Sequence, residues 1–150
     1  MKWTLLLVVI SFLSVNGQSV DVRQKNFNVK KNVAIEGYDP VSYFSGEPLE
    51  GTDKFQFAYK GITYQFVNAT NLNKFKSDPS NYEPAYGGWC AYAMGESGEK
   101  VKIDPETYKI LDGKLYLFYH FWGNNTLEAW SKNEKALKAK GDQNWKNIVQ

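Results

Sequence analysis

Two stretches of the chain alternate apolar and polar residues around a short turn, and each predicts an antiparallel hairpin. The first turns at Lys60-Gly61. Its register places the apolar side chains of both strands on one face, in the pairs Tyr59 with Ile62, Phe57 with Tyr64 and Phe55 with Phe66. A register one residue out of step would scatter these side chains over both faces, so the pattern itself fixes the pairing.

The second hairpin turns at residues 112–113, an Asp-Gly pair that strongly favours a two-residue turn. It pairs Ile110 with Leu115 and Tyr108 with Leu117. Apolar residues also lie on the opposite face of these strands. We therefore expect the second pair of strands to be more central in the molecule than the first.

Three segments have the spacing and the end signals of helices. A short helix is expected after Asp39, which would cap it, with Pro40 at the first helical position. A second helix is expected over residues 69–77, and a third over 125–141, where Gly141 would end it. This order of elements predicts an α+β fold, a small single domain with antiparallel hairpins and three helices.

The first 17 residues have the pattern of a secretory signal peptide. Lys2 provides a positive start, residues 5–13 are apolar, and Gly17 provides a small residue at the cleavage position. The apolar stretch is shorter than the roughly 20 residues that span a bilayer. We expect cleavage after Gly17, no stable membrane insertion after cleavage, and a secreted or periplasmic location.

The remaining residues divide into two parts. Residues 18–32 are polar and are expected to form a loosely ordered leader with a short strand near 27–29, whereas residues 33–148 form the domain. The net charge of +2 falls to +1 when Lys2 is removed, which is too small to indicate nucleic acid as a partner. Aromatic residues make up 16% of the chain, enough to build a core without disulfide bonds.

The chain has a single cysteine, Cys90, which cannot form an internal disulfide bond. In an oxidising compartment such a thiol is buried and inert, bound to a metal, reactive, or paired with another molecule. A reactive thiol needs a nearby cation or helix N-terminus, and the neighbouring residues supply no basic side chain. Any such partner must come from the fold. Otherwise the cysteine is a small hydrophobic residue packed among its aromatic neighbours.

Several motifs agree in order and spacing with one protein family. They are Gly-Tyr-Asp-Pro-Val-Ser-Tyr-Phe at 37–44, Asp-Pro-Ser-Asn-Tyr-Glu-Pro at 78–84, Tyr-Gly-Gly-Trp-Cys-Ala-Tyr-Ala at 86–93, Leu-Asp-Gly-Lys-Leu-Tyr-Leu at 111–117 and Asp-Gln-Asn-Trp at 142–145. Over about residues 33–148 the chain resembles the YHS domain family, in its small exported branch with a single cysteine.

The resemblance implies a metal-binding domain, because the family as a whole is usually described in that way. Members that resemble metal carriers have cysteines where this chain has Ser42, Val67 and Asn71, so their thiolate site is not inherited here. In the exported branch some members have selenocysteine at the position of Cys90. The resemblance therefore implies that the sulfur or selenium atom at this position takes part in the chemistry.

The candidate ligand-binding residues lie in two of these motifs. They are Cys90, Tyr86, Trp89, Tyr92, Tyr38 and Asp39. The aromatic residues beside the cysteine would line a pocket, and the tyrosine and aspartate of the first motif would add polar groups. The alternatives are that the aromatic residues belong to the core and that Asp39 only caps a helix.

A soft-metal site is predicted at Cys90, with His120, the only histidine, and Met94 as further ligands. Such ligands suit copper better than zinc, because a structural zinc site takes four nitrogen or sulfur ligands that histidine and cysteine cannot supply here. The alternatives are a histidine with an ordinary hydrogen bond and a methionine that fills the core.

Taken together, these patterns predict an exported small binding module with a soft-metal or small-ligand site centred on Cys90, and copper as the first candidate. Two alternatives stay open. The chain is a thiol redox protein whose Cys90 is oxidised and then reduced by a thiol partner, or it is a non-catalytic adaptor with an inert cysteine. The sequence contains no phosphate-binding glycine loop and no nucleophilic-serine motif, so a binding role is favoured over an enzymatic one.

Overall fold

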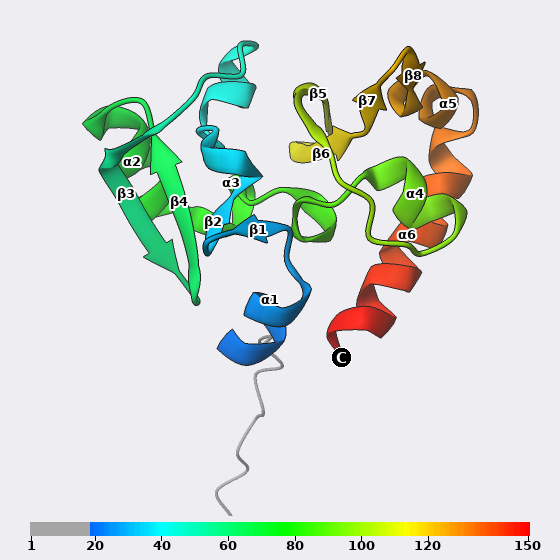
Figure 1. Ribbon diagram of the computed structural model, residues 1–150, viewed down its shortest axis with the longest axis horizontal. Coiled ribbons are helices and arrows are strands. Elements are labelled where there is room, and N and C mark those ends of the chain that lie inside the picture. The colour runs from blue at the N-terminus through cyan, green and yellow to red at the C-terminus, as the bar shows by residue number, and fades with distance from the viewer. Residues whose placement is uncertain (1–18) are drawn as a thin grey trace, which may run out of the picture.

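Two groups of strands, each accompanied by its own helices, make up the structure (Figure 1). The computed structural model describes residues 19–150, so the predicted signal peptide lies outside the described residues. The strands are β1 (Val29–Lys30), β2 (Val33–Ala34), β3 (Thr52–Tyr59), β4 (Ile62–Phe66), β5 (Asp104–Leu111), β6 (Lys114–Phe118), β7 (His120–Phe121) and β8 (Asn124–Asn125).

The helices lie before, between and after these strands. The α-helices are α1 (Val20–Asn26), α2 (Ala69–Ser77), α3 (Pro79–Tyr82), α4 (Ala91–Glu96), α5 (Thr126–Lys132) and α6 (Glu134–Val149). Three short 3-10 helices are η1 (Ile35–Gly37), η2 (Ser42–Ser45) and η3 (Ala85–Gly88). The predicted α+β class is confirmed, with more short helices than the three that we expected. Within residues 19–150, no helix is both long and apolar enough to cross a bilayer.

The segment before the domain contains an α-helix, so the prediction of a loosely ordered leader is wrong. Helix α1 begins after Ser19, whose hydroxyl oxygen accepts a hydrogen bond from Val22 N at 3.3 Å. Arg23 and Phe27 are buried against the rest of the molecule. The sequence conceals this packing, because the buried face contains a charged side chain whose partner, Glu83, lies 60 residues away.

The first sheet has the strand order β1-β2-β4-β3, in which β2 is parallel to β4 and the other neighbours are antiparallel. The hairpin β3–β4 has two of the predicted pairs, Tyr59 with Ile62 and Phe57 with Tyr64. The predicted pair of Phe55 with Phe66 is wrong, because the register shifts within β3 and Phe66 faces Thr52 instead. Shifts of this kind bend a strand and are common near the edge of a sheet.

The second hairpin, β5–β6, has the predicted pairs of Ile110 with Leu115 and Tyr108 with Leu117. Strand β6 is buried on both faces over residues 115–118, as the apolar residues on both sides of it predicted. A parallel bridge joins Leu117 to Cys90, which precedes α4. This bridge places the cysteine beside the second hairpin.

The predicted helix over 69–77 is confirmed as α2, and the helix expected after Asp39 is the short 3-10 helix η2 instead. The third predicted helix divides at Asn133 into α5 and α6. Gly141 lies inside α6 rather than at its end. A Cβ atom at this position would lie 2.8 Å from Tyr86 Oη, so the glycine makes room for a tyrosine and does not end the helix.

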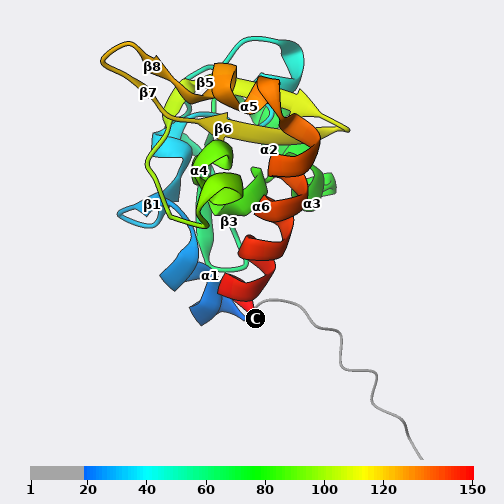
Figure 2. The same ribbon diagram turned by 90° about the vertical axis from the view of Figure 1, so that its right-hand side faces the viewer.

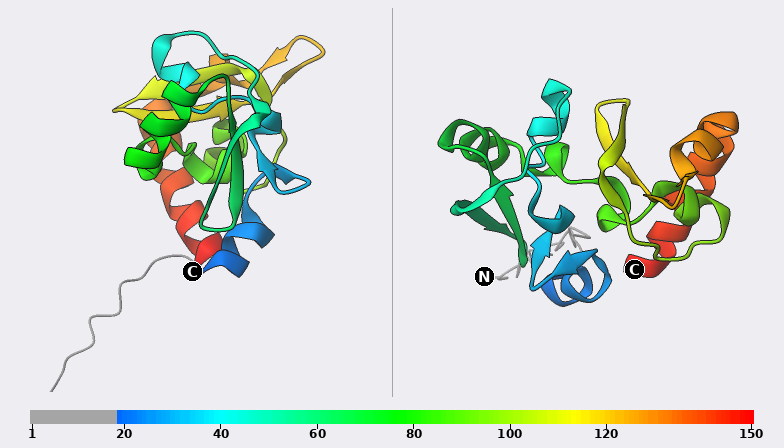
Figure 3. Two further views of the ribbon diagram at one scale, coloured as in Figure 1. Left: turned by 90° about the vertical axis from the view of Figure 1, so that its left-hand side faces the viewer. Right: turned by 45° about the horizontal axis from the view of Figure 1, so that its top comes forward.

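The buried side chains form two hydrophobic clusters, one around the first sheet and the other around β6, α4 and α6. Phe75 of α2 is a fully buried member of the first cluster, and Trp130 of α5 is a fully buried member of the second. Tyr92 and Trp145 pack against both clusters, so the core is continuous. Figure 2 and the left view of Figure 3 show α1 beside the C-terminal end of α6, at the bottom of the molecule.

Candidate functional site

Cys90 is fully buried and lines a cavity of about 260 Å³. Helix α4 provides Tyr92 and Ala93 to the wall, and the loop that follows α4 provides Val101. The segment around the β7–β8 hairpin forms the opposite wall of the cavity. The remaining lining residues are Glu96, Ser97, Tyr119, Asn124 and Thr126. Most of the cavity surface is apolar, so the sulfur atom faces a small and largely apolar space.

The Cys90 side chain takes part in a short chain of hydrogen bonds. The Thr126 hydroxyl donates to Tyr119 O at 2.9 Å, so its oxygen, 3.4 Å from Cys90 Sγ, is placed to accept the thiol proton. Tyr119 N donates to Cys90 Sγ at 3.4 Å. The backbone is held as well, because Cys90 N donates to Val101 O at 3.0 Å. These contacts fix the direction of the thiol within the cavity.

The charge around Cys90 differs from that around a reactive thiol. Within residues 19–150, the side chains that line the cavity include no lysine, arginine or histidine, and Glu96 is the one carboxylate. A catalytic thiolate is usually stabilised by a cation. The polar contacts of the sulfur are instead Tyr119 N and Thr126 Oγ1, both of which are uncharged.

The predicted aromatic residues do not form one pocket. Tyr92 lines the cavity beside Cys90. Trp89 instead donates from Nε1 to Asn26 O at 2.6 Å, which anchors the end of α1. Tyr86 lines a different and larger cavity, where its hydroxyl donates to Asp142 Oδ1 at 2.9 Å. Burial and the Asp142 carboxylate raise the pKa of Tyr86 well above its ordinary value.

Tyr38 and Asp39 also lie away from the cavity at Cys90. The Tyr38 hydroxyl donates to Glu106 Oε1 at 3.3 Å, and burial followed by the Glu106 charge raises the pKa of Tyr38. Asp39 is fully buried, and its Oδ1 accepts hydrogen bonds from Val41 N at 2.8 Å and Ser42 N at 3.3 Å. Asp39 therefore holds the turn that leads into η2, whose N-cap residue is Val41, so the expected helix cap is replaced by a turn one step earlier in the chain.

Asp39 also brings together Ser42, Val67 and Asn71, the three positions at which the resemblance in the sequence predicts cysteines in metal carriers. Its Oδ2 accepts hydrogen bonds from Val67 N at 3.0 Å and Asn71 Nδ2 at 2.7 Å. Its backbone carbonyl accepts a hydrogen bond from the Ser42 hydroxyl at 2.7 Å. A buried hydrogen-bond network around a carboxylate thus occupies the place where the resemblance puts a thiolate site in those members.

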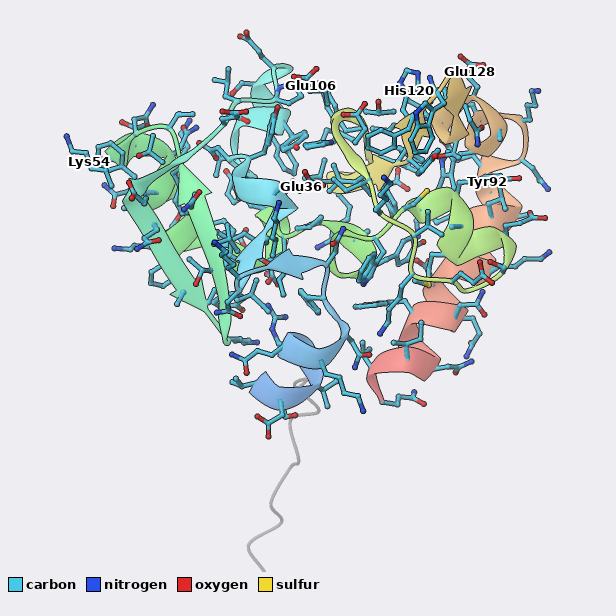
Figure 4. All side chains as sticks on the ribbon, in the orientation of Figure 1. Glu36, Lys54, Tyr92, Glu106, His120 and Glu128 are labelled. Carbon is cyan, nitrogen blue, oxygen red and sulfur yellow. The ribbon has the colours of Figure 1, made fainter. Side chains whose placement is uncertain are left out.

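The three predicted metal ligands are not gathered around one point. His120 is exposed, and its Nδ1 lies 3.1 Å from Thr107 Oγ1 and 3.9 Å from Asp104 Oδ2. In Figure 4, His120, the first residue of β7, lies at the top of the molecule, whereas Tyr92 of the cavity lies on α4 below it. Met94 is fully buried in the second hydrophobic cluster. No cluster of three or more histidine, cysteine or acidic side chains suited to a metal occurs within residues 19–150.

Sequence reasoning missed the residues that contact Cys90 most closely, namely Val101, Tyr119 and Thr126. Thr126 had a local signal, because the capping residue Asn125 places it at the first position of α5. Val101 and Tyr119 bind the cysteine through backbone atoms, which every residue type provides. Their positions had no signal that could be found in the residue types.

Comparisons of the chain with protein-family models, with curated proteins and with solved structures find no match. The resemblance to the YHS domain family stays a prediction that rests on the motifs in the sequence. The function has to be inferred from the geometry of the site.

Proposed function

We propose that this chain is a small binding module that holds a compact, largely apolar organic ligand in the cavity at Cys90. The proposal rests on one observation, a buried sulfur atom in the wall of a mostly apolar space of about 260 Å³. Ligand pockets typically combine apolar walls with a few polar groups that orient the ligand. The thiol of Cys90, the hydroxyl of Thr126 and the amide of Asn124 are such groups here.

The geometry favours binding over thiol redox chemistry. A cysteine that exchanges disulfides is accessible and has a cation nearby that stabilises the thiolate. Cys90 is buried, and the partners of its sulfur are Tyr119 N and Thr126 Oγ1. The cavity also favours binding over an adaptor with an inert cysteine, because an apolar recess beside the thiol is a feature that a ligand uses and an adaptor does not need.

Copper, or another soft metal, stays a second form of the same proposal. Cu(I) accepts few ligands and prefers sulfur, so Cys90 would be its main protein ligand. His120 and Met94 do not line the cavity, so we do not expect either of them to contribute. Export and membership of the YHS family are likewise proposed on the sequence patterns alone.

A cavity-filling variant tests the proposal most directly. We expect toluene and p-cresol, added to the signal-free protein, to shift the backbone amide signals of Tyr92 and Val101 in NMR spectra. Ala93→Phe places a ring in the cavity and should remove these shifts. Met94→Leu is the matched control, since it removes a buried sulfur atom outside the cavity and should leave the shifts in place. Shifts that persist in the folded Ala93→Phe variant would contradict the proposal.

Reactions of the thiol separate the ligand, metal and redox forms of the proposal. Bound toluene should slow the alkylation of Cys90 by iodoacetamide. Stoichiometric Cu(I) uptake that is lost in Cys90→Ser, but kept in Met94→Leu and His120→Ala, would favour the metal form. Fast alkylation of the ligand-free protein at neutral pH, unaffected by toluene, would favour the redox alternative instead.

A further inference from the structure

A second cavity, of about 430 Å³, lies between α1, η3, β6 and α6, and charged and aromatic side chains line it together. Tyr86 lines this second cavity, whereas Cys90 lines the smaller one. We propose that this second cavity binds a small organic anion with an aromatic ring, such as an aryl carboxylate or an aryl phosphate. The inference is independent of the function proposed for Cys90.

Four aromatic side chains form the apolar part of the wall. They are Phe27, Tyr86, Tyr116 and Trp145. The rings of Phe27 and Trp145 lie 5.7 Å apart, and those of Tyr86 and Tyr116 are also 5.7 Å apart. Phe27 directly follows α1 and pairs with Trp145 of α6, whereas Tyr86 belongs to η3 and Tyr116 to β6. Aromatic walls of this kind bind a flat ring by stacking and by edge contacts.

The positive charge of the wall comes from Arg23 and Lys114, which lie near one carboxylate, Glu83. Arg23 forms a buried ion pair with Glu83, and Tyr64 Oη donates to the same carboxylate at 2.6 Å. The Lys114 ammonium donates to a neutral acceptor, the carbonyl oxygen of Ser80, at 2.8 Å. Within residues 19–150, Lys114 forms no ion pair of its own. Three basic side chains, Arg23, Lys60 and Lys114, thus line the wall against two acidic ones, Glu83 and Asp142, so the wall has a net positive charge.

The partial burial of Lys114 increases what an anion would gain there. Burial lowers the pKa of Lys114, and the Glu83 and Asp78 carboxylates oppose this effect without cancelling it. An ammonium that has lost part of its water interacts more strongly with a carboxylate or phosphate than an exposed one does. A third basic residue, Lys60, lines the same cavity.

The other acidic residue in the wall does not remove this positive charge. Asp142 accepts hydrogen bonds from Lys138 Nζ at 2.7 Å and from Tyr86 Oη at 2.9 Å. Its charge is therefore already balanced by a lysine outside the wall. An aromatic cation would meet three basic side chains in this wall, and both carboxylates are already paired with a basic residue, so the cavity favours an anion over a cation.

The shape of the cavity depends on a glycine in the same motif as Cys90. Gly87 has φ of +60°, and a Cβ atom there would lie 2.7 Å from the Trp145 ring and 3.0 Å from the Phe27 ring. A side chain at this position would push the Phe27–Trp145 pair apart. The volume of about 430 Å³ is within the range of small-molecule sites and accommodates one or two fused rings with an acidic group.

The test uses three ligands that share a ring system and differ in charge: 2-naphthoate, 2-naphthalenemethanol and 2-naphthylmethylamine. We expect 2-naphthoate to bind the signal-free protein about ten-fold more tightly than the neutral alcohol, and the amine to bind most weakly. The amide signals of Tyr86 and Gly87 and the indole signal of Trp145 should move in NMR titrations. The signals of Tyr92 and Val101, at the other cavity, should stay in place.

Variants of one lysine separate the effect of its charge from nonspecific hydrophobic binding of the naphthalene ring. Lys114→Met should weaken 2-naphthoate about ten-fold and leave the alcohol unchanged, whereas Lys114→Arg should retain most of the preference. Lys54→Met is the matched control, because Lys54 lies on β3 at the far side of the molecule (Figure 4). Unfolding midpoints of the variants verify that each one folds.

Three results would overturn the inference. The first is equal affinity for the three ligands, and the second is a preference for 2-naphthoate that survives in folded Lys114→Met. The third is a set of shifts confined to Tyr92 and Val101, which would mean that 2-naphthoate enters the cavity at Cys90 and that the larger cavity is not its site.

Discussion

Asp39 shows how one buried side chain can organise a region of this molecule. Its two carboxylate oxygens accept four hydrogen bonds, two from the backbone of Val41 and Ser42 and two from Val67 and Asn71. The first pair closes a local turn. The second pair reaches the segment that leads into α2, so the carboxylate joins two segments that are distant in the chain.

Substitution of Asp39 tests this structural role. Asp39→Asn keeps the shape of the side chain but turns an NH₂ group towards two of the donors, so we expect the free energy of unfolding to fall by about 2–4 kcal/mol. Urea denaturation measures the loss. Asp53→Asn, at an exposed position on β3, should change it by less than about 0.5 kcal/mol. A loss as small in Asp39→Asn would mean that these hydrogen bonds contribute little.

At the residue scale the sequence predicted local contacts and missed distant ones. The bonds from Val41 N and Ser42 N to Asp39 followed from its position before Pro40, because such a turn is set by neighbours in the chain, although the helix itself begins later, at Ser42. Its bond to Asn71 could not be predicted, since 32 residues separate the two side chains. The same holds for Cys90 and Thr126, which are 36 residues apart.

At the scale of elements, one ion pair joins the second hairpin to the last helix. Glu134 begins α6 and pairs with Lys109 of β5, and it also accepts a hydrogen bond from Trp130 Nε1 at 3.0 Å. The hydrogen bond from Lys109 is the largest of the effects that lower the pKa of Glu134 below its ordinary value. The contact therefore adds to stability only while the carboxyl group is ionised.

This lowered pKa predicts how stability depends on pH. Because Glu134 is more acidic in the folded chain than in the unfolded chain, its stabilising effect is complete above the ordinary carboxyl pKa of 4.5 and is lost as the pH falls through the lower folded value. At pH 7, Glu134→Gln should lower the free energy of unfolding by up to about 1 kcal/mol, since both side chains are partly exposed.

The difference between Glu134→Gln and the wild type should shrink as the pH drops below 4.5 in a series of urea denaturations. Glu99→Gln, at an exposed position, is the control and should show no such trend. A difference that stays constant down to low pH would mean that the charge of Glu134 is not what stabilises the contact.

The elements themselves were predicted where the signal was local. Alternation and turn chemistry gave the pairing of β5–β6 and the inner pairs of β3–β4, and a cap with an Asp-Pro stop gave α2. The prediction of α6 failed at Gly141, because the glycine is required by the hydroxyl of Tyr86 and not by the end of a helix. A contact between distant segments here outweighed a reliable local rule.

At the scale of the whole molecule, α1 connects the two groups of strands. Arg23 Nε donates to Lys60 O at 3.1 Å in the turn of β3–β4, and its guanidinium pairs with Glu83. Phe27, at the end of the same helix, packs on Trp145 of α6. One helix of seven residues thus contacts both sides of the molecule.

Removal of the Arg23 charge should therefore weaken the whole fold. Arg23→Met leaves the buried Glu83 carboxylate without its ion-pair partner, so we expect a loss of about 3–5 kcal/mol in the free energy of unfolding. The double variant Arg23→Met/Glu83→Gln should recover part of this loss, because no charge is then left buried. Lys25→Met, on the exposed face of α1, is the control.

Urea denaturation followed by circular dichroism measures these variants. The single variant Glu83→Gln completes the comparison. A double variant whose loss equals the sum of the losses in Arg23→Met and Glu83→Gln would show that Arg23 and Glu83 are not coupled.

The two cavities lay beyond sequence reasoning for a physical reason. Each forms where segments distant in the chain meet, α4 with the β7–β8 region in one case and α1 with α6 in the other. An unfilled space has no residue pattern of its own. The sequence identified one motif, residues 86–93, as important, and the structure shows that its first residues line one cavity and its later residues line the other.

The position of Trp145 gives this protein a built-in optical reporter. Its indole packs on Phe27 of α1, whereas Trp130 is sealed in the core and Trp122 is 88% exposed to water. Indole emission moves to longer wavelengths when water reaches the ring. The departure of α1 would therefore change the fluorescence of Trp145, and of Trp89, which binds Asn26 O of the same helix, and leave Trp122 and Trp130 unaffected. Intrinsic tryptophan fluorescence can thus report whether α1 is docked, without an attached dye.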